Sequence, residues 1–381
     1  MSSDLTARLA AMEAATMLRR IPDDSRDTAT VDLTTNDYLG LAARADLQEN
    51  FLADADNRRS PFTSSASRLL ASHQADYSAL ESLLDSLGAP HGLRSLLFNS
   101  GYHANSGLVG AITRLFSRPL ILADKLVHAS IIDGIILSRT DFRRFPHNDF
   151  DRLEAMLQRT ASTPERPDGV IIIVESVYSM DGDRADIDRL IDLKRRYSRA
   201  DMEVMLYVDE AHAFGVEGPS GLGLVAASCE PAAVDVTVGT FGKALASSGA
   251  FAWMSPELRE WAVNSARSFI FSTSMPPVTA RYTRYMVETM LGMDSERGKL
   301  RRLCAILDPA DCRYIYPAIT GSACRAVELS HRLRDELGIK VLPIRTPTVP
   351  PGTERLRISL NATVDGDSLR SLRSFLDKNL Q

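Results

Sequence analysis

A single lysine stands among small residues in "VGTFGKALASSG" (Val238 to Gly249), directly after the apolar stretch "AAVDVTV". Small neighbours let another molecule approach a lysine amine closely. A phosphate-binding P-loop and a Schiff base with an aldehyde cofactor are two chemistries that use such a lysine. A P-loop needs G-x-x-x-x-G-K-[ST], but only two residues separate Gly239 from Gly242, and Ala244 follows Lys243. The P-loop is excluded, and a solvated loop lysine or a Schiff-base lysine remains.

Four further positions follow apolar runs elsewhere in the chain. Asp209 ends the run "VMLYVD", and His212 comes three residues later. His128 follows "ADKLV", and Gly101 opens a small-residue turn before a helical pattern. Taken singly, Asp209 is better read as a helix cap, the histidines as structural residues, and the turn as an anion site common in α/β proteins. A buried Asp209 would nevertheless need a cation beside it.

These features fit together under one hypothesis, a site for pyridoxal 5′-phosphate. This cofactor needs a lysine for its aldehyde, a carboxylate for its pyridinium nitrogen and an anion site for its phosphate, and a flat side chain against its ring helps. The candidates for these roles, in that order, are Lys243, Asp209, the Gly101–Tyr102 turn and His128. The ring nitrogen would be the cation that Asp209 requires, and the small residues around Lys243 would leave space for the cofactor.

Strand and helix patterns predict where these residues lie. Five nearly continuous apolar runs suit strands buried on both faces of a parallel sheet, namely "RSLLF", "RPLILAD", "GVIIIVES", "MEVMLYVD" and "VDVTVGT". Helical patterns such as "HQADYSALESLLDSLG" and "DIDRLIDLKRRYS" lie between them. In the first of these helices, Gly88 is expected to cap an apolar face made of Tyr77, Leu80, Leu83, Leu84 and Leu87. The alternation predicts an α/β fold with a mostly parallel sheet, whose carboxyl edge gathers the candidate residues.

The pattern changes past about residue 280. Two helical segments, "RYTRYMVETMLGM" and "SERGKLRRLCAIL", precede a strand "RYIYPAIT", a helix "SACRAVELSHRLRDELG" and two strands, "IKVLPI" and "ERLRISLN". We therefore expect an N-terminal segment over 1–45, a large α/β domain over 46–280 and a smaller C-terminal α+β domain over 281–381.

Composition argues against nucleic-acid-binding, secreted, membrane and metal-binding proteins. Of 381 residues, 44% are hydrophobic and 24% are charged, and the formal net charge of −5 is spread without long runs of one sign. This argues against nucleic acid as a partner. The N-terminus lacks the apolar core of a signal peptide, and no apolar stretch is long enough for a membrane span. The four cysteines and seven histidines show no metal-ligand spacing, so we expect a cytoplasmic protein with no metal site and no membrane partner.

Taken jointly, the motifs resemble those of the α-oxoamine synthases, fold type I enzymes that use pyridoxal phosphate. The resemblance runs nearly end to end, from "TTNDYLGLA" to "ERLRISL", and includes "FNSGYHAN", "DKLVHASIIDG", "ESVYSMDGD", "VDEAHAFGVEGPSGLG" and "GTFGKALASSG". It implies a large domain with a mostly parallel central sheet plus a smaller C-terminal α+β domain. It also implies a homodimer whose active sites lie at the subunit interface.

The resemblance also implies roles around the cofactor ring. Lys243 would bind the cofactor covalently and later transfer protons. Asp209 would keep the pyridine nitrogen protonated, and His128 would stack on the ring. His212 and Ser179 would hydrogen-bond around the phenolic oxygen of the ring.

Further residues are implied to bind the phosphate and the substrates. The phosphate site would consist of Gly101, Tyr102, Thr240 and, from the neighbouring subunit, Thr273. The amino-acid carboxylate would be held by Arg345 and Thr348. The acyl substrate would meet Arg19.

Among α-oxoamine synthases, the chain resembles most those that condense L-alanine with a pimeloyl thioester in biotin biosynthesis, with coenzyme A or an acyl carrier protein as the thioester carrier. The motifs "RRFPHND", "STSMPP" and "TPTVPPGTERLR" carry this finer resemblance. A sister enzyme is the first alternative, using glycine with an acetyl thioester or serine with another acyl chain. A non-catalytic subunit is the second, and the retention of Lys243, Asp209 and His128 speaks against it. A pyridoxal-dependent regulator is the third, and the segment before "TTNDYLG" is too short for a DNA-binding domain.

The chain departs from the family at three places. "TSSASR" (Thr63 to Arg68) stands where the family has a glycine-rich stretch, and Ser72 and Ala213 stand where glycine is common. If the backbones of the "TSSASR" stretch and of Ser72 need a positive φ, each non-glycine residue there costs roughly 1–2 kcal/mol, and Ala213 is a smaller departure. Because this loop lies near the substrate in the family, acyl selectivity is the property these departures affect.

Overall fold

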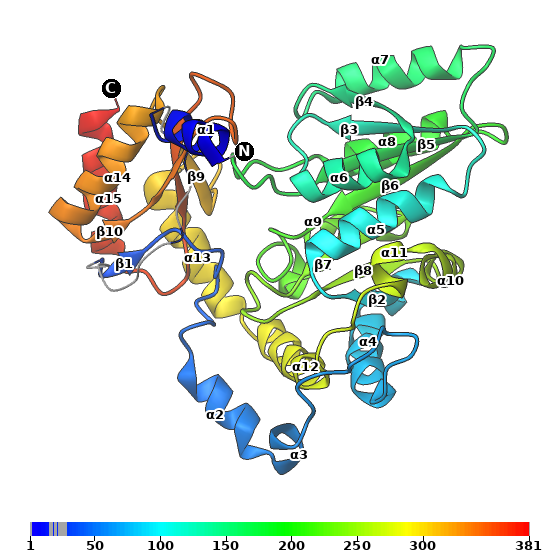
Figure 1. Ribbon diagram of the computed structural model, residues 1–381, viewed down its shortest axis with the longest axis horizontal. Coiled ribbons are helices and arrows are strands. Elements are labelled where there is room, and N and C mark those ends of the chain that lie inside the picture. The colour runs from blue at the N-terminus through cyan, green and yellow to red at the C-terminus, as the bar shows by residue number, and fades with distance from the viewer. Residues whose placement is uncertain (1, 15–17, 19–20, 22–28, 381) are drawn as a thin grey trace. The chain divides into compact units, whose positions relative to one another are not determined.

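The computed structural model of the protein describes residues 2–14, 18, 21 and 29–380 (Figure 1). By their internal contacts these residues form two compact units. The large unit consists of Leu39–Tyr178 and Arg184–Asp294, and the small unit of the described residues up to Tyr38, Ser179–Asp183 and the described residues from Ser295 onward. The expected domain boundaries after residues 45 and 280 stay predictions.

A seven-stranded sheet forms the centre of the large unit as far as it is described. Its strands are β2 (Arg94–Phe98), β3 (Pro119–Asp124), β4 (Asp141–Phe145), β5 (Gly169–Glu175), β6 (Glu203–Asp209), β7 (Val236–Thr240) and β8 (Ala250–Met254). Their order is β2-β8-β7-β6-β5-β3-β4, and β8 runs antiparallel to both of its neighbours. The other pairs are parallel. The mostly parallel sheet predicted from the apolar runs is confirmed, and the carboxyl ends of six strands share one edge.

Helices cover both faces of this sheet (Figure 1). One face packs against α5 (Gly101–Thr113), α6 (Ala129–Ser138), α10 (Pro256–Ser265) and α11 (Arg267–Ile270). The other packs against α7 (Phe150–Ala161) and α8 (Ile187–Tyr197). Successive strand residues point to opposite faces, so Ile171 and Ile173 join the first layer and Ile172 the second. All seven residues of β5 are buried, which explains its continuous apolar run.

Further helices complete the large unit. They are α2 (Ala45–Ala53), α3 (Ala55–Arg58), α4 (Gln74–Gly88), α9 (Leu224–Ala227), α12 (Pro277–Leu291) and the short 3-10 turns η2 (Ala89–His91), η3 (Pro219–Gly221) and η4 (Pro231–Ala233). No helix among the described residues combines the length and the apolar character that crossing a membrane requires.

The small unit is built on short strands and three long helices. A three-stranded antiparallel sheet has the order β11 (Leu342–Ile344), β12 (Arg355–Ser359), β9 (Ile315–Ile319), and β1 (Val31–Asp32) pairs in parallel with β10 (Ile339–Lys340). The helices are α13 (Asp294–Leu307), α14 (Ala323–Leu337) and α15 (Gly366–Asn379), with α1 (Ser2–Ala14) near the N-terminus.

Several details differ from the sequence-based expectations. The strands β4 and β8 and the helix α15 were not predicted. Four of the five residues of β4 are exposed, so this edge strand lacks the apolar run that marks the others. The cap predicted at Gly88 is wrong, because Gly88 is the buried last residue of α4. A Cβ there would lie 3.2 Å from Leu93 Cβ and from Trp253 Nε1, so close packing explains the glycine.

Glu210 anchors the loop that follows β6. Its carboxyl oxygens accept hydrogen bonds from the backbone N–H groups of Leu224, at 3.0 Å, and of Val225, at 2.7 Å. The side chain is 1% exposed, and this burial raises the pKa of Glu210 to about 7. Glu210 thereby fixes the segment that carries His212.

The segment Ser179–Asp183 is held within the small unit by buried arginines of β12. Arg357 Nε donates to the carbonyl oxygen of Ser179 at 2.6 Å, and Arg355 pairs with Asp181. Gly182, in the same segment, has φ +67°, and a Cβ there would lie 2.0 Å from the carbonyl oxygen of Ile315. Both the backbone angle and the space therefore require glycine.

Gly182→Ala should lower the free energy of unfolding of the small unit by about 3 kcal/mol or more, because strain at the positive φ adds to a backbone clash. The matched control is Gly352→Ala, at φ +82° with no atom within 4 Å of the added Cβ. The control should lose only about 1–2 kcal/mol. Urea unfolding of both variants measures the difference, and equal losses would contradict the clash.

Glu210 makes stability depend on pH. Because its pKa is raised from 4.5 to about 7 on folding, the folded state binds more protons than the unfolded state between these values. Its contribution is therefore complete below pH 4.5 and is lost as pH rises through 7, by about 3 kcal/mol in total. Glu210→Gln should flatten this fall in urea unfolding between pH 5 and 8. Glu203→Gln, at the exposed start of the same strand, should keep the wild-type slope, and an unchanged slope in Glu210→Gln would refute the assignment.

Candidate functional site

The candidate residues of the large unit gather at the carboxyl edge of its sheet. Asp209 is the last residue of β6 and Thr240 the last of β7. Gly101 begins α5 shortly after β2, and His128 caps α6 shortly after β3. This is the edge at which open α/β sheets bind ligands.

Lys243 lies in the loop between β7 and β8 and contacts a histidine from the loop after β6. The distance between Lys243 Nζ and His212 Nε2 is 2.8 Å. His212 is 4% exposed, whereas Lys243 is half-buried. The structure thus brings together the amine and the imidazole that the sequence predicted for one site.

The small residues around Lys243 also have a packing role. Ala244 is fully buried, and a Cβ on Gly215 would lie 2.6 Å from its Cβ. Ala246 has φ +47°, and its N–H donates to the carbonyl oxygen of Lys243 at 2.9 Å. Gly249 has φ +105°, with the carbonyl oxygen of Phe98 at 3.1 Å from a Cβ placed there. The tight winding of this loop therefore needs small residues, in addition to any space they leave for a ligand.

Asp209 is a buried carboxylate, 4% exposed, that receives hydrogen bonds from neutral donors. Its Oδ1 accepts from the N–H of Ala211 at 2.9 Å, and its Oδ2 accepts from Asn105 Nδ2 at 2.7 Å. Asn105 was not among the predicted site residues, although it lies in the quoted motif "FNSGYHAN". The spacing of four residues from Gly101, one turn into α5, was the signal that could have found it.

Glu175 is a second acidic residue that sequence reasoning missed. It ends β5 in register with Asp209 on β6, so both side chains leave the same face of the sheet. Glu175 is 2% exposed, and its Oε1 has no hydrogen-bond partner. Burial, reinforced by the nearby Asp209, raises the pKa of Glu175 well above its usual value. The environment of Glu175 therefore favours its protonated form beside Asp209.

His128 caps the N-terminus of α6, and the residue is exposed. Its Nδ1 lies 2.7 Å from Ser130 Oγ and accepts from the N–H of Ser130 at 3.2 Å. Desolvation lowers the pKa of His128, with the Lys243 charge acting in the same direction and the Asp209 charge opposing it. An exposed imidazole that is close enough to feel the charges of Asp209 and Lys243 suits stacking against a planar ligand.

The first turn of α5 supplies the candidate anion site. Ser100 caps the helix by accepting from the N–H of His103. The earlier N–H groups, of Gly101 and Tyr102, have no partner within the helix, as at any helix N-terminus. The Thr240 side chain is close, since its Oγ1 lies 3.9 Å from a Cβ placed on Gly101. Together with the helix dipole, these groups can hold a phosphate.

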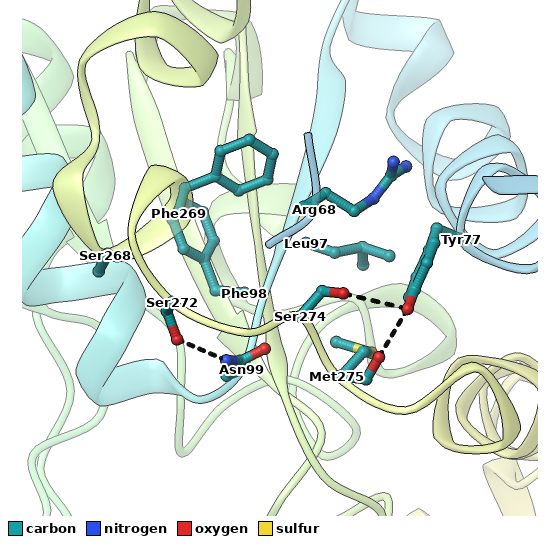
Figure 2. A pocket seen from close by; sticks show the side chains of 10 residues that line it. All are labelled: Arg68, Tyr77, Leu97, Phe98, Asn99, Ser268, Phe269, Ser272, Ser274 and Met275. Carbon is teal, nitrogen blue, oxygen red and sulfur yellow. Dashed lines mark hydrogen bonds between the residues drawn. The ribbon is translucent and has the colours of Figure 1, made fainter. Parts of the chain in front are cut away.

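A small pocket lies where the segment of Thr273 passes the end of β2 (Figure 2). Asn99 Nδ2 donates to Ser272 Oγ at 2.9 Å and to the carbonyl oxygen of Thr273. Tyr77 OH donates to the carbonyl oxygen of Met275 at 2.7 Å (Figure 2). Thr273 itself is exposed, and it pairs with Ser67 of the "TSSASR" loop in an antiparallel bridge.

The three departures from the family pattern differ in backbone conformation. Ser65 of "TSSASR" has φ +52° and so carries the expected strain. Neither Ser72 nor Ala213 has a positive φ, whereas His73, next to Ser72, has φ +60°. The conditional cost of a positive φ therefore applies at Ser65 and not at Ser72.

The remaining predicted residues belong to the small unit or lie outside the described chain. Ser179, Arg345 and Thr348 belong to the small unit, where the N–H of Thr348 donates to the carbonyl oxygen of Arg345 at 2.9 Å. Ser179 is held by Arg357, as described above. Arg19 lies outside the described residues.

The groups at the sheet edge of the large unit match the chemical demands of pyridoxal phosphate. The buried carboxylate of Asp209 suits a protonated ring nitrogen, and the amine of Lys243 suits an aldehyde. The N-terminus of α5 with Thr240 suits a phosphate. The donor set of the chain therefore fits this cofactor.

Known proteins resemble this chain in sequence. Residues 28–376 match the family described as aminotransferase class I and II. The chain is 44% identical over 362 residues to "Putative 8-amino-7-oxononanoate synthase" of Glaesserella parasuis, covering 92% of each chain. It is 41% identical over 374 residues to the protein of the same name from Pasteurella multocida, covering 93% of each.

Two solved structures extend the comparison. The fold resembles serine palmitoyltransferase of Sphingomonas wittichii, with a TM-score of 0.82, 24% identity and coverage of 98% of this chain and 96% of that one. It also resembles 8-amino-7-oxononanoate synthase of Francisella tularensis, with a TM-score of 0.74, 25% identity and coverage of 93% and 98%. The chain belongs to the aminotransferase class I and II family and, within it, to the α-oxoamine synthases, acyl-transferring enzymes that depend on pyridoxal phosphate.

Proposed function

We propose that the enzyme condenses L-alanine with a pimeloyl thioester to give 8-amino-7-oxononanoate, carbon dioxide and the free thiol. The observation that carries the proposal is the contact of 2.8 Å between Lys243 Nζ and His212 Nε2, at the same sheet edge as the buried Asp209. The two relatives above 40% identity support the choice of substrates, because they share the name of an enzyme with this activity.

Pyridoxal phosphate, when bound, supplies an electron sink for negative charge at the carbon next to the amino group. The residues of this chain would hold and polarise it. Asp209, fixed by Asn105 and by the N–H of Ala211, would stabilise a proton on the ring nitrogen. The first turn of α5 and Thr240 would bind the phosphate, and His128 would cover one ring face.

Lys243 is our candidate for moving the substrate proton. An amine is a base only when it is uncharged, and His212, whose Nε2 lies 2.8 Å from Lys243 Nζ, can share or accept a proton from it. Lys243 Nζ would remove the α-proton of alanine before the new carbon–carbon bond forms, and would return a proton after carbon dioxide leaves. Glu210 anchors the loop that carries His212 and so keeps His212 within contact of Lys243.

Residues beyond this edge are assigned by resemblance to the family. Arg345 with Thr348 is our candidate for the carboxylate of alanine, Ser179 for a hydrogen bond to the ring oxygen, and Arg19 for the acyl substrate. We also propose a homodimer in which Thr273 serves the phosphate of the neighbouring subunit. The exposed position of Thr273 is compatible with that role.

A sister activity with serine and a longer acyl chain is the second candidate. The fold of the chain matches serine palmitoyltransferase with a TM-score of 0.82 and the oxononanoate synthase with a TM-score of 0.74. At 24% identity, however, that likeness supports the fold alone. The relatives above 40% identity favour alanine.

Lys243→Ala should reduce thiol release from pimeloyl-coenzyme A in the presence of L-alanine by at least about 100-fold, because both the covalent anchor and the base are lost. Lys299→Ala, which removes an exposed lysine of α13, should retain wild-type turnover.

The wild-type enzyme should respond to L-alanine far more strongly than to glycine or L-serine. A preference for serine would move the protein to the second candidate, and normal turnover in Lys243→Ala would refute the assigned chemistry.

A further inference from the structure

Behind the predicted cofactor residues lies a chain of buried polar side chains, of which the roles above use only the bond from Asn105 to Asp209. It consists of Tyr207 on β6, Asn105 on α5 and Ser130 on α6. Tyr207 OH donates to Asn105 Oδ1 at 2.7 Å, and Asn105 Nδ2 lies 2.7 Å from Asp209 Oδ2 and 2.9 Å from Ser130 Oγ. Ser130 Oγ lies 2.7 Å from His128 Nδ1. The chain therefore joins Asp209 to His128.

The direction of each hydrogen bond follows from the chemistry of Asp209. A carboxylate can only accept, so the amide atom that faces Asp209 is the NH₂ group of Asn105. The second hydrogen of that NH₂ group points to Ser130 Oγ, which accepts it. The amide oxygen is left to face Tyr207, whose hydroxyl donates. Each donor and acceptor of the Asn105 amide is thus assigned a partner.

The same reasoning sets the tautomer of His128. Ser130 Oγ accepts from Asn105, so its own hydrogen is available to donate to His128 Nδ1. The N–H of Ser130 also donates to His128 Nδ1, at 3.2 Å. Two donors at Nδ1 require a lone pair there, which leaves the ring hydrogen on Nε2. The lowered pKa of His128 agrees with a neutral ring.

A purely structural role does not explain this arrangement. Asn105 is 2% exposed and Ser130 is fully buried. Burying an amide is unfavourable unless its groups are paired, and an apolar side chain of the same shape would fill the space. The polar chain instead begins and ends at the two groups expected to touch the cofactor ring.

We propose that Asn105 is a positioning residue that orients the carboxylate of Asp209 and, through Ser130, holds His128 as the neutral tautomer with its hydrogen on Nε2. The inference rests on the proposed cofactor site and is independent of the acyl substrate. One amide thereby controls both the group at the edge of the cofactor ring and the group at its face. Each of them loses its fixed geometry if the amide is removed.

The test compares Asn105→Leu and Ser130→Ala with the matched control Thr113→Val. Thr113 is a buried polar residue of the same helix whose hydroxyl bonds to the carbonyl oxygen of Gly110, outside this chain. The first readout is the ¹⁵N spectrum of histidine-labelled protein without cofactor, in which His128 is assigned by its loss in His128→Gln. Wild type and Thr113→Val should show an unprotonated Nδ1 and a protonated Nε2. Ser130→Ala should show a mixture of tautomers, because only the longer bond from the backbone N–H of residue 130, at 3.2 Å, then favours a lone pair on Nδ1. Asn105→Leu should also show a mixture, because the Ser130 hydroxyl no longer accepts from Asn105 and is free to accept from a protonated Nδ1.

The second readout is the affinity for pyridoxal phosphate, followed by absorbance. Asn105→Leu should weaken it about 10-fold, because a hydrogen bond to a charged group is lost. Ser130→Ala, which leaves the bond to Asp209 intact, should change it less than about 3-fold. The Ser130→Ala spectrum keeps the test decisive if Asn105→Leu fails to fold.

A protonated Nδ1 in the wild type would overturn the proposal. So would an Asn105→Leu variant that folds and matches Thr113→Val in both readouts. Neither readout uses alanine or a thioester, so failure of the proposed acyl chemistry would leave these results unaffected. Absence of cofactor binding in the wild type would instead refute the proposed function, while the histidine spectrum would still decide the tautomer.

Discussion

Burial of the Asp209 carboxylate is the constraint on which the site depends. A charge that is 4% exposed is costly unless hydrogen bonds and a cation compensate for lost hydration. The parallel sheet meets the first need, because its carboxyl edge lets α5 and the loop after β6 direct donors at Asp209. The carboxylate still needs a cation beside it, and this need gives the site an affinity for a cationic ring. Fold and ligand chemistry are therefore linked through one side chain.

The sequence predicts those parts of the fold in which burial produces a simple pattern of apolar residues. Strands such as β5 are buried on both faces and read as continuous apolar runs. The edge strand β4 is mostly exposed and carries "DFRRF", so no such run marks it. Gly88 shows a different limit, because its role comes from the contact with Trp253, which is distant in sequence. Local pattern cannot reveal a tertiary contact of this kind.

The same distinction separates the site residues that the sequence predicts from those it misses. Lys243, Asp209 and His128 follow apolar runs, and the position of a strand end is readable from local sequence. Asn105 acts through partners on α6 and β6, and these meet only when the chain is folded. The family pattern alone does not tell which non-glycine residues have a positive φ, because Ser65 has one and Ser72 does not.

Three carboxyl groups, those of Glu175, Asp209 and Glu210, lie at the ends of β5 and β6. Their environments differ in burial and in hydrogen bonding. Burial raises the pKa of Glu175 well above its usual value, and burial raises the pKa of Glu210 to about 7. Asp209 alone among these three has both an amide side chain and a backbone N–H placed on its oxygens, at 2.7 and 2.9 Å, while one oxygen of Glu175 has no partner. Charging Glu175 would place two carboxylates on adjacent strands in register, so the arrangement favours a protonated Glu175 beside Asp209. A carboxylate in one fixed position is suited to hold a proton on the nitrogen of a cofactor ring. Asn105 fixes the position of the Asp209 carboxylate through its hydrogen bond to Oδ2.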